Sequence, residues 1–222
     1  MTPIKFEPPD FAGLAENLDC RLEFKPKQTL DDVLPDQRIY KGPTKTRFTD
    51  IGSDVYDREK TAAALERLGG IPGEGECWHL VTDGGFDVIH MIDACIHFAG
   101  KPCRHLHIAT LAANRKSVAG LKEMMDAGRL QTVSVLMSIF FRDGDSEGSR
   151  ATAQAFADIG VQVHFAKTHA KYYLIAFDGP ALVIEGSLNL RQCRSVEQLT
   201  VTNNRNLLTF YRNIFESLIP KP

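Results

Sequence analysis

The chain lacks the features that mark membrane-inserted, secreted and strongly cationic proteins. Its 222 residues contain no run of about 18 apolar residues, the minimum for a membrane-spanning helix. The opening stretch MTPIKFEPPDF has no apolar core of the kind found in signal peptides. The formal net charge is only −2, so the chain as a whole is not a polycation and any positive surface must be local. We therefore expect no membrane partner.

Cysteine is scarce and follows no repeated spacing. An odd total of five cysteines indicates free thiols and a reducing compartment, so the cytoplasm is the expected location. The stretch ACIHFAGKPCRHLHI (94–108) contains metal-ligand residue types, but their spacing matches no common zinc pattern. We interpret these residues as structural and expect neither a metal nor a cofactor. His107, near the C-terminal end of its predicted strand, is a candidate for the rim of a site.

Residues 1–75 differ from the rest of the chain and contain no internal repeat. They are rich in proline and charge, as in FEPPDF and YKGPTKTRFTD. One helix is expected at 56–68, ended by Gly69 and Gly70. We interpret 1–75 as an irregular N-terminal extension with one helix, which packs on the main domain or on a partner chain. We expect residues 76–222 to form the main, catalytic domain.

From residue 77 the sequence alternates between strand and helix patterns. Strands are expected at 77–82, 105–110, 132–141 and 161–166, and helices at 86–98, 116–127 and 150–159. A hairpin at 171–186, a strand at 196–202 and a closing helix at 206–218 follow. The alternation predicts an α/β fold with a mixed, mostly parallel sheet between helices.

Polar residues stand at both open ends of the predicted hairpin. His169 and Lys171 are two residues apart, so in an extended segment their side chains face the same way. The hairpin brings the chain back, which places the segment Gly186–Asn189 beside them, and a glycine there allows close backbone approach. An imidazole, an ammonium, a hydroxyl and an amide therefore converge at one end of the sheet. This set suits a phosphate group.

The motif resembles the signature of the phospholipase D superfamily. His169-Ala-Lys171 followed by Gly186-Ser187-Leu188-Asn189 is similar to H-x-K, four residues, Asp, six residues, G-S-x-N. Glu197 on the following strand, and the closing helix NLLTFYRNIFESL, resemble the small bacterial endonucleases of that group. The resemblance covers roughly 77–218 and implies a phospholipase D-like α/β fold.

Two departures from the family pattern lie inside the hairpin. The family aspartate would fall at Ala176, and Asp178 comes two residues later in the predicted turn. The distance from histidine to glycine is also three residues longer than in the family. A longer hairpin accommodates the insertion without separating its two ends.

The resemblance implies a mechanism and a role for each motif residue. His169 would attack phosphorus and form a covalent phosphohistidine. Lys171 and Asn189 would hold the non-bridging oxygens, and Ser187 would hydrogen-bond within the site. Glu197 would accept a hydrogen bond from the other ring nitrogen of His169 and fix its tautomer. A single motif implies a homodimer, whose two-fold axis supplies the second histidine as general acid.

The expected function is a metal-independent phosphodiesterase, an endonuclease that cleaves nucleic acid, with DNA as the preferred class. Arg191 and Arg194 are candidate substrate-binding residues, although a solvated surface explains them equally well. Residues 161–222 contain seven Lys and Arg against four acids, a mild local excess. A phosphatidyl-type phosphodiesterase is one alternative. A catalytically weak nucleic-acid-binding or regulatory protein is the other, kept open by Ala176. Strandedness and sequence preference are left open by the sequence.

Overall fold

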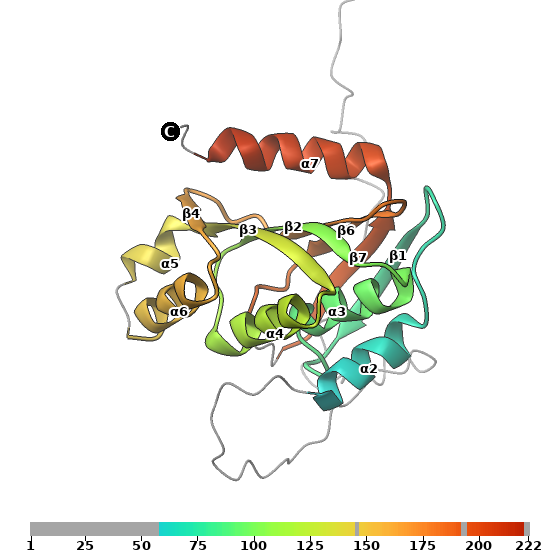
Figure 1. Ribbon diagram of the computed structural model, residues 1–222, viewed down its shortest axis with the longest axis horizontal. Helices are drawn as coiled ribbons and strands as arrows, with labels where there is room; N and C mark the ends of the chain where they lie inside the picture. The colour runs from blue at the N-terminus through green and yellow to red at the C-terminus, as the bar shows by residue number, and fades with distance from the viewer. Residues whose placement is uncertain (1–57, 145–146, 192–194, 220–222) are drawn as a thin grey trace, which may run out of the picture. The chain divides into compact units, whose positions relative to one another are not determined.

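The computed structural model describes residues 58–144, 147–191 and 195–219. They form one seven-stranded sheet with helices on both faces (Figure 1). The strands are β1 (Cys77–Thr82), β2 (Cys103–Thr110), β3 (Leu130–Ser138), β4 (Val163–Ala166), β5 (Tyr172–Ala176), β6 (Ala181–Gly186) and β7 (Glu197–Asn203). The helices are α2 (Arg58–Leu68), α3 (Val88–Ala99), α4 (Arg115–Asp126), α5 (Ile139–Asp143), α6 (Glu147–Asp158) and α7 (Arg205–Leu218).

The sheet confirms the α/β class but corrects the predicted strand directions. Its order is β1-β7-β6-β5-β2-β3-β4. Only β2–β3 and β3–β4 pair in parallel, and the other four pairs are antiparallel. The expectation of a mostly parallel sheet was therefore wrong. Strands β1 to β4 do run in one direction, as the alternation predicts, but β5, β6 and β7 insert between β1 and β2 and create the antiparallel pairs.

One predicted strand is shorter than its apolar run. The run at 132–141 was expected to be one strand, but β3 ends at Ser138. The Ser138 hydroxyl accepts a hydrogen bond from the Phe140 amide at 3.3 Å, and the short helix α5 follows. An apolar run cannot by itself distinguish a buried strand from the start of a helix.

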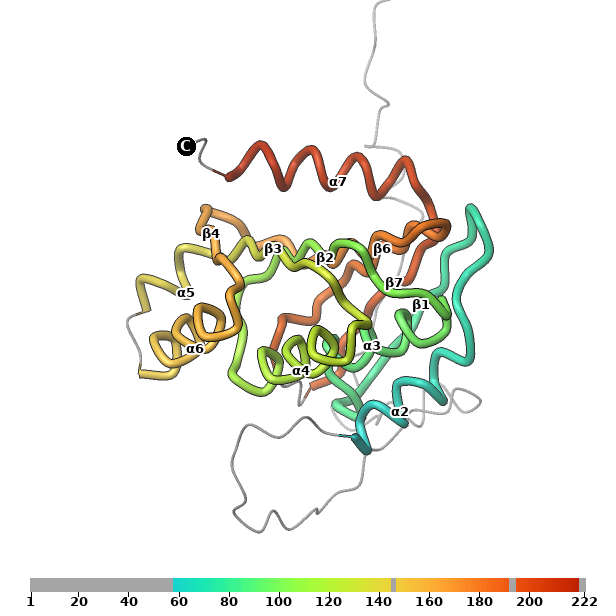
Figure 2. The backbone as a smooth tube through the Cα atoms, in the orientation of Figure 1, coloured from blue at the N-terminus to red at the C-terminus, as the bar shows by residue number. Residues whose placement is uncertain are grey.

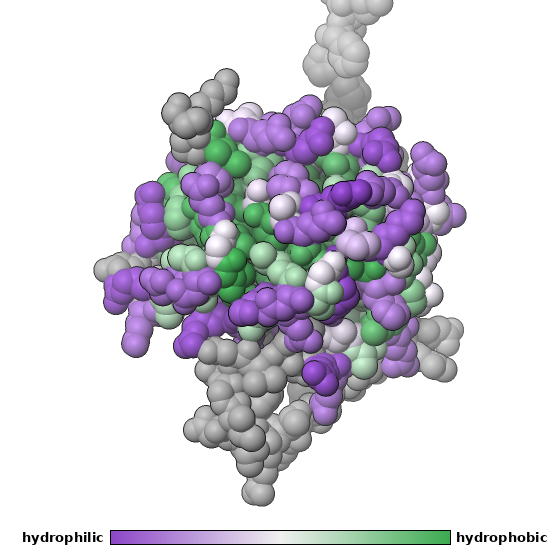
Figure 3. All heavy atoms as spheres, in the orientation of Figure 1, coloured by the Kyte–Doolittle hydropathy of each residue, from purple (hydrophilic) through white to green (hydrophobic). Residues whose placement is uncertain are grey.

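The two faces of the sheet bury different side chains. Helix α7 covers one face, and α3 and α4 lie on the other (Figures 1 and 2). Along β5, Tyr172 and Leu174 pack in the cluster that includes α7. Tyr173 and Ile175 alternate with them and join the larger cluster that includes α3 and α4. On the side of the molecule shown in Figure 3, apolar residues are exposed between polar ones.

The helix expected at 56–68 is present as α2, from Arg58 to Leu68. Ala64 and Leu68 belong to the main core, and Lys60 Nζ lies 3.0 Å from an Asp87 carboxylate oxygen. Residues 1–57 lie outside the described part of the chain, so the extension and its boundary at residue 75 stay predictions. None of the helices in the described segments has the length and apolar content needed to cross a bilayer.

Candidate active site

The ends of several strands lie together along one edge of the sheet. This edge is the one at which strands begin and end, and it is not formed by an outermost strand. Strand β6 ends and β7 begins there, since Gly186 lies opposite Leu199. Strand β5 begins at the same edge, where β2 ends, because Tyr172 lies opposite Ala109. Every candidate motif residue follows or precedes one of these strand ends. The topology therefore brings to one edge of the sheet motif residues that are spread over nearly thirty positions of the sequence.

His169 and Lys171 lie in the segment that enters β5. The His169 side chain is exposed, and Lys171 is half-buried. Lys171 Nζ is 3.2 Å from His169 Nδ1 and donates to the His169 carbonyl oxygen at 3.1 Å. Because an ammonium has only donors, a hydrogen bond between these two atoms uses the Nδ1 lone pair as its acceptor. The pair therefore places a positive charge beside a solvent-accessible ring.

The loop after β6 returns beside this pair and is fixed by β7. The Gly186 amide lies 3.4 Å from the Lys171 carbonyl oxygen, so the two ends of the hairpin meet. The Ser187 amide donates to the Gln198 carbonyl at 3.0 Å, and the Gln198 amide donates to Ser187 Oγ at 3.1 Å. In the structure the Ser187 side chain thus anchors its own loop to the neighbouring strand.

Asn189 is oriented by the segment that follows β2. Its side-chain oxygen accepts from the Leu111 amide at 3.2 Å and lies 3.5 Å from Thr110 Oγ1. Because the Leu111 backbone amide holds the Asn189 side-chain oxygen, the side-chain NH₂ group points away from Leu111. That group is the donor that a phosphate oxygen would need.

Glu197 begins β7 at the same edge but does not contact His169. It is half-buried and lies opposite Thr82. Its negative charge, after burial as the larger cause, contributes to a raised pKa of the buried Tyr173 hydroxyl. No hydrogen bond joins Glu197 to His169 within the described residues. Its expected role in fixing the histidine tautomer stays a prediction.

The structure describes only one of the two candidate substrate-binding arginines. Arg191 is exposed, directly after Leu190, whose carbonyl accepts from the Asn114 amide at 3.1 Å. It therefore lies close to the loop that carries Asn189. Arg194 lies outside the described residues, so its role stays a prediction.

The two departures from the family pattern lie at the far end of the hairpin. Ala176 ends β5 opposite Ala181, and Asp178 follows in the turn. A strand as long as β5 spans about 17 Å, which separates this turn from His169. The exposed Asp178 pairs with Arg104, whose guanidinium lowers the pKa of the Asp178 carboxyl. Neither position reaches the candidate site.

The histidines of β2 lie away from the site. His107 was considered for the rim, but its ring packs against Phe215 of α7, with centroids 5.1 Å apart, and next to His105. Burial, with the nearby His105 as a second cause, lowers the pKa of His107 to about 4. Within the described segments no group of three His, Cys, Asp or Glu side chains is arranged to hold a metal ion.

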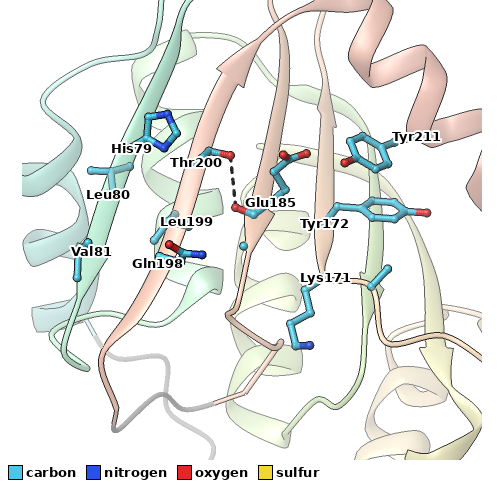
Figure 4. Close-up of a pocket in the computed structure, with 12 residues that line it drawn as sticks. His79, Leu80, Val81, Lys171, Tyr172, Glu185, Gln198, Leu199, Thr200 and Tyr211 are labelled. Carbon is cyan, nitrogen blue, oxygen red and sulfur yellow. Dashed lines mark hydrogen bonds between the residues drawn. The ribbon is translucent and has the colours of Figure 1, made fainter. Parts of the chain in front are cut away.

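A cavity of about 490 Å³ opens on the α7 side of the same edge (Figure 4). Its floor includes Tyr172, Glu185 and Thr200, and Tyr211 of α7 lies above it. Tyr172 alternates with Tyr173 along β5, so the cavity lies on the face of the sheet opposite to the one that buries Tyr173. It meets the candidate site at this edge, where Ala170, Lys171 and Gly186 line it.

Comparison with known proteins gives similarity at the level of structure. No protein-family model matches the chain, and no curated protein sequence does. Solved structures of similar fold include Nuc from Salmonella typhimurium, described as a phospholipase D family member. It is 16% identical, covers 64% of this chain and 94% of its own, and gives a TM-score of 0.48. NucT from Helicobacter pylori is 12% identical, with coverage of 64% and 96% and a TM-score of 0.43.

Polyphosphate kinase from Porphyromonas gingivalis gives a TM-score of 0.51 at 16% identity. The match covers 71% of this chain but only 29% of the kinase. At this level of identity the likeness shows a shared fold. The chemistry of the candidate site rests on its own residues.

Proposed function

We propose that the chain is a metal-independent phosphodiesterase of the phospholipase D superfamily, which cleaves nucleic acid, with DNA as the expected substrate. The observation that carries the proposal is the meeting of His169 and Lys171 with the Asn189 loop at one sheet edge. A nucleophilic nitrogen, a fixed ammonium and an oriented amide donor are the groups that attack at phosphorus needs.

The first step transfers the phosphoryl group to the protein. A lone pair on the neutral His169 ring attacks phosphorus, the new P–N bond forms, and the P–O bond to the leaving nucleotide breaks. The leaving oxygen takes a proton from a general acid. Lys171 and Asn189 hold the non-bridging oxygens, whose negative charge is stabilised in the transition state.

The second step releases the product and restores the enzyme. Water attacks the phosphohistidine, the P–N bond breaks, and the group that gave up its proton now takes one from the water. The product is a phosphate monoester, and His169 returns to its neutral form. We assign Ser187 to holding the loop and Glu197 to orienting the ring once the substrate has drawn Lys171 away from Nδ1.

The need for a proton donor in the first step is the reason to propose a homodimer. The chain has one copy of the motif, and the chemistry needs a second imidazole beside the first. A two-fold axis at this sheet edge would bring the His169 side chains of two copies together. The exposure of His169 leaves it accessible to such a partner.

The choice of nucleic acid rests on local charge. Lys167 and Arg191 are both exposed and come from the segments on either side of the motif. Together with Lys171 and Arg194 they would contact phosphates along a polynucleotide. The alternative of a non-cleaving phosphate-binding protein rests on Ala176, which lies at the distant end of β5.

The test uses purified full-length protein with supercoiled plasmid DNA, in EDTA and with added Mg²⁺. We expect nicking and cleavage at equal rates in both, because no metal takes part in the two steps. Abolition of cleavage by EDTA would contradict the metal-independent chemistry. Sedimentation of the same sample at micromolar concentration should show a dimer, and a cleaving monomer would contradict the shared site.

A further inference from the structure

The hydroxyl of Tyr173 lies buried beneath the candidate site. Tyr173 is 1% exposed, and its hydroxyl donates to the carbonyl of Leu188 at 2.8 Å. Leu188 directly precedes Asn189 in the loop. Tyr173 also lies in β5, the strand that begins directly after Lys171. One buried phenol therefore links the strand that follows the lysine to the loop that carries the amide.

Thr110 fixes the other side of the same loop. It is fully buried at the end of β2. Its hydroxyl accepts from the Leu190 amide at 3.0 Å, donates to the Ala112 carbonyl at 3.0 Å, and lies 3.5 Å from the Asn189 side-chain oxygen. The residues before and after Asn189 are thus each held by a buried side chain from a different strand.

We propose that Tyr173 and Thr110 are positioning residues, which fix the Asn189 loop so that its amide NH₂ group faces the scissile phosphate. This inference rests on the proposed function, since Asn189 is assigned there to a phosphate oxygen. Neither residue touches the substrate. Both act through the backbone of Leu188 and Leu190.

The energetic argument is preorganisation. A donor that stabilises developing charge is effective when it is held in place before the reaction, because no reorganisation is then needed. Small displacements of such a donor cost much of its effect. Without the threonine hydroxyl the buried Leu190 amide loses its acceptor, and without the tyrosine hydroxyl the Leu188 carbonyl loses its donor. In both cases the loop loses a hydrogen bond that holds it in place, so it can shift.

The chain offers a matched control in Tyr172. This neighbouring tyrosine is also buried, but it lies on the α7 face, and its hydroxyl has no hydrogen-bond partner within the described residues. Tyr172→Phe and Tyr173→Phe therefore remove the same atom from adjacent buried positions. Only the second removes a bond to the Asn189 loop.

The first measurement is steady-state cleavage of a small phosphodiester reporter. We expect Tyr173→Phe and Thr110→Val to lower kcat about 10- to 100-fold, with KM changed less than about twofold, since the lost effect belongs to the transition state. Thr110→Ser should keep the wild-type kcat, because serine retains the hydroxyl that Thr110→Val removes. Tyr172→Phe should also leave kcat unchanged. Unchanged kcat in Tyr173→Phe and Thr110→Val, or an equal loss in Tyr172→Phe, would overturn the proposal.

The second measurement does not depend on cleavage. In ¹⁵N spectra the Asn189 side-chain NH₂ signal, assigned with Asn189→Asp, should shift in Tyr173→Phe and Thr110→Val but not in Tyr172→Phe. If this signal moves as expected while the wild type cleaves no phosphodiester, the positioning stands and the proposed function fails. If the signal stays in place in both variants while the wild type cleaves, the positioning fails alone.

Discussion

Replacing His169 by alanine should reduce phosphodiester cleavage by about 10⁴-fold or more, because removal of a nucleophile abolishes the covalent route. His169 is exposed and makes its side-chain contact only with Lys171 within the described residues, so folding should be unaffected. Initial rates on plasmid DNA and on a small reporter, with thermal unfolding alongside, measure both effects.

The control for this variant is another exposed histidine. His97 lies on α3, with its ring edge-on to Phe98 and no link to the sheet edge that carries the motif. His97→Ala should retain the wild-type rate. A comparable loss in both variants would show that a general effect of the substitution, and not the nucleophile, had been measured.

Replacing Gly186 by alanine should destabilise the protein by about 3 kcal/mol, and should also remove activity. A Cβ at this position would lie 2.2 Å from the Gln198 carbonyl oxygen and 2.7 Å from the Leu199 Cα. Both are backbone atoms of β7, so relief requires β6 and β7 to separate. That separation would displace Ser187, which bonds to Gln198, and with it the loop that carries Asn189.

Urea unfolding measures the stability change, and Gly70→Ala is its control. A Cβ at Gly70 would meet only the Trp78 ring, at an ordinary contact distance of 3.6 Å. The control should therefore unfold within about 1 kcal/mol of the wild type. Equal stability of Gly186→Ala and the wild type would mean that the two strands do not approach as closely as the structure shows.

The hairpin was the part of the fold that the sequence predicted best. Two apolar runs around Asp178-Gly179-Pro180 define it locally, and the structure places the strands there with the motif at the open end. The order of the strands was not predictable in the same way. Insertion of β5 to β7 between β1 and β2 depends on which edges pair over long separations, and hydrophobic periodicity contains no such information.

The supporting residues of the site were missed for the same reason. Thr110 is 79 residues from Asn189 in the chain, and its sequence context is an ordinary strand end. Tyr173 was part of an apolar run in which alternation sends neighbouring tyrosines to opposite faces. A threonine at the end of a strand that adjoins the hairpin was the only available signal, and it became specific once the register was known.

The stereochemical course at phosphorus tests the central claim most directly. A phosphorothioate diester of defined configuration, cleaved in H₂¹⁸O, yields a chiral ¹⁸O-labelled phosphorothioate monoester whose configuration can be read. Two successive in-line displacements, the first by His169 and the second by water, predict net retention. Inversion would mean a single direct attack by water, and would contradict a covalent intermediate on His169.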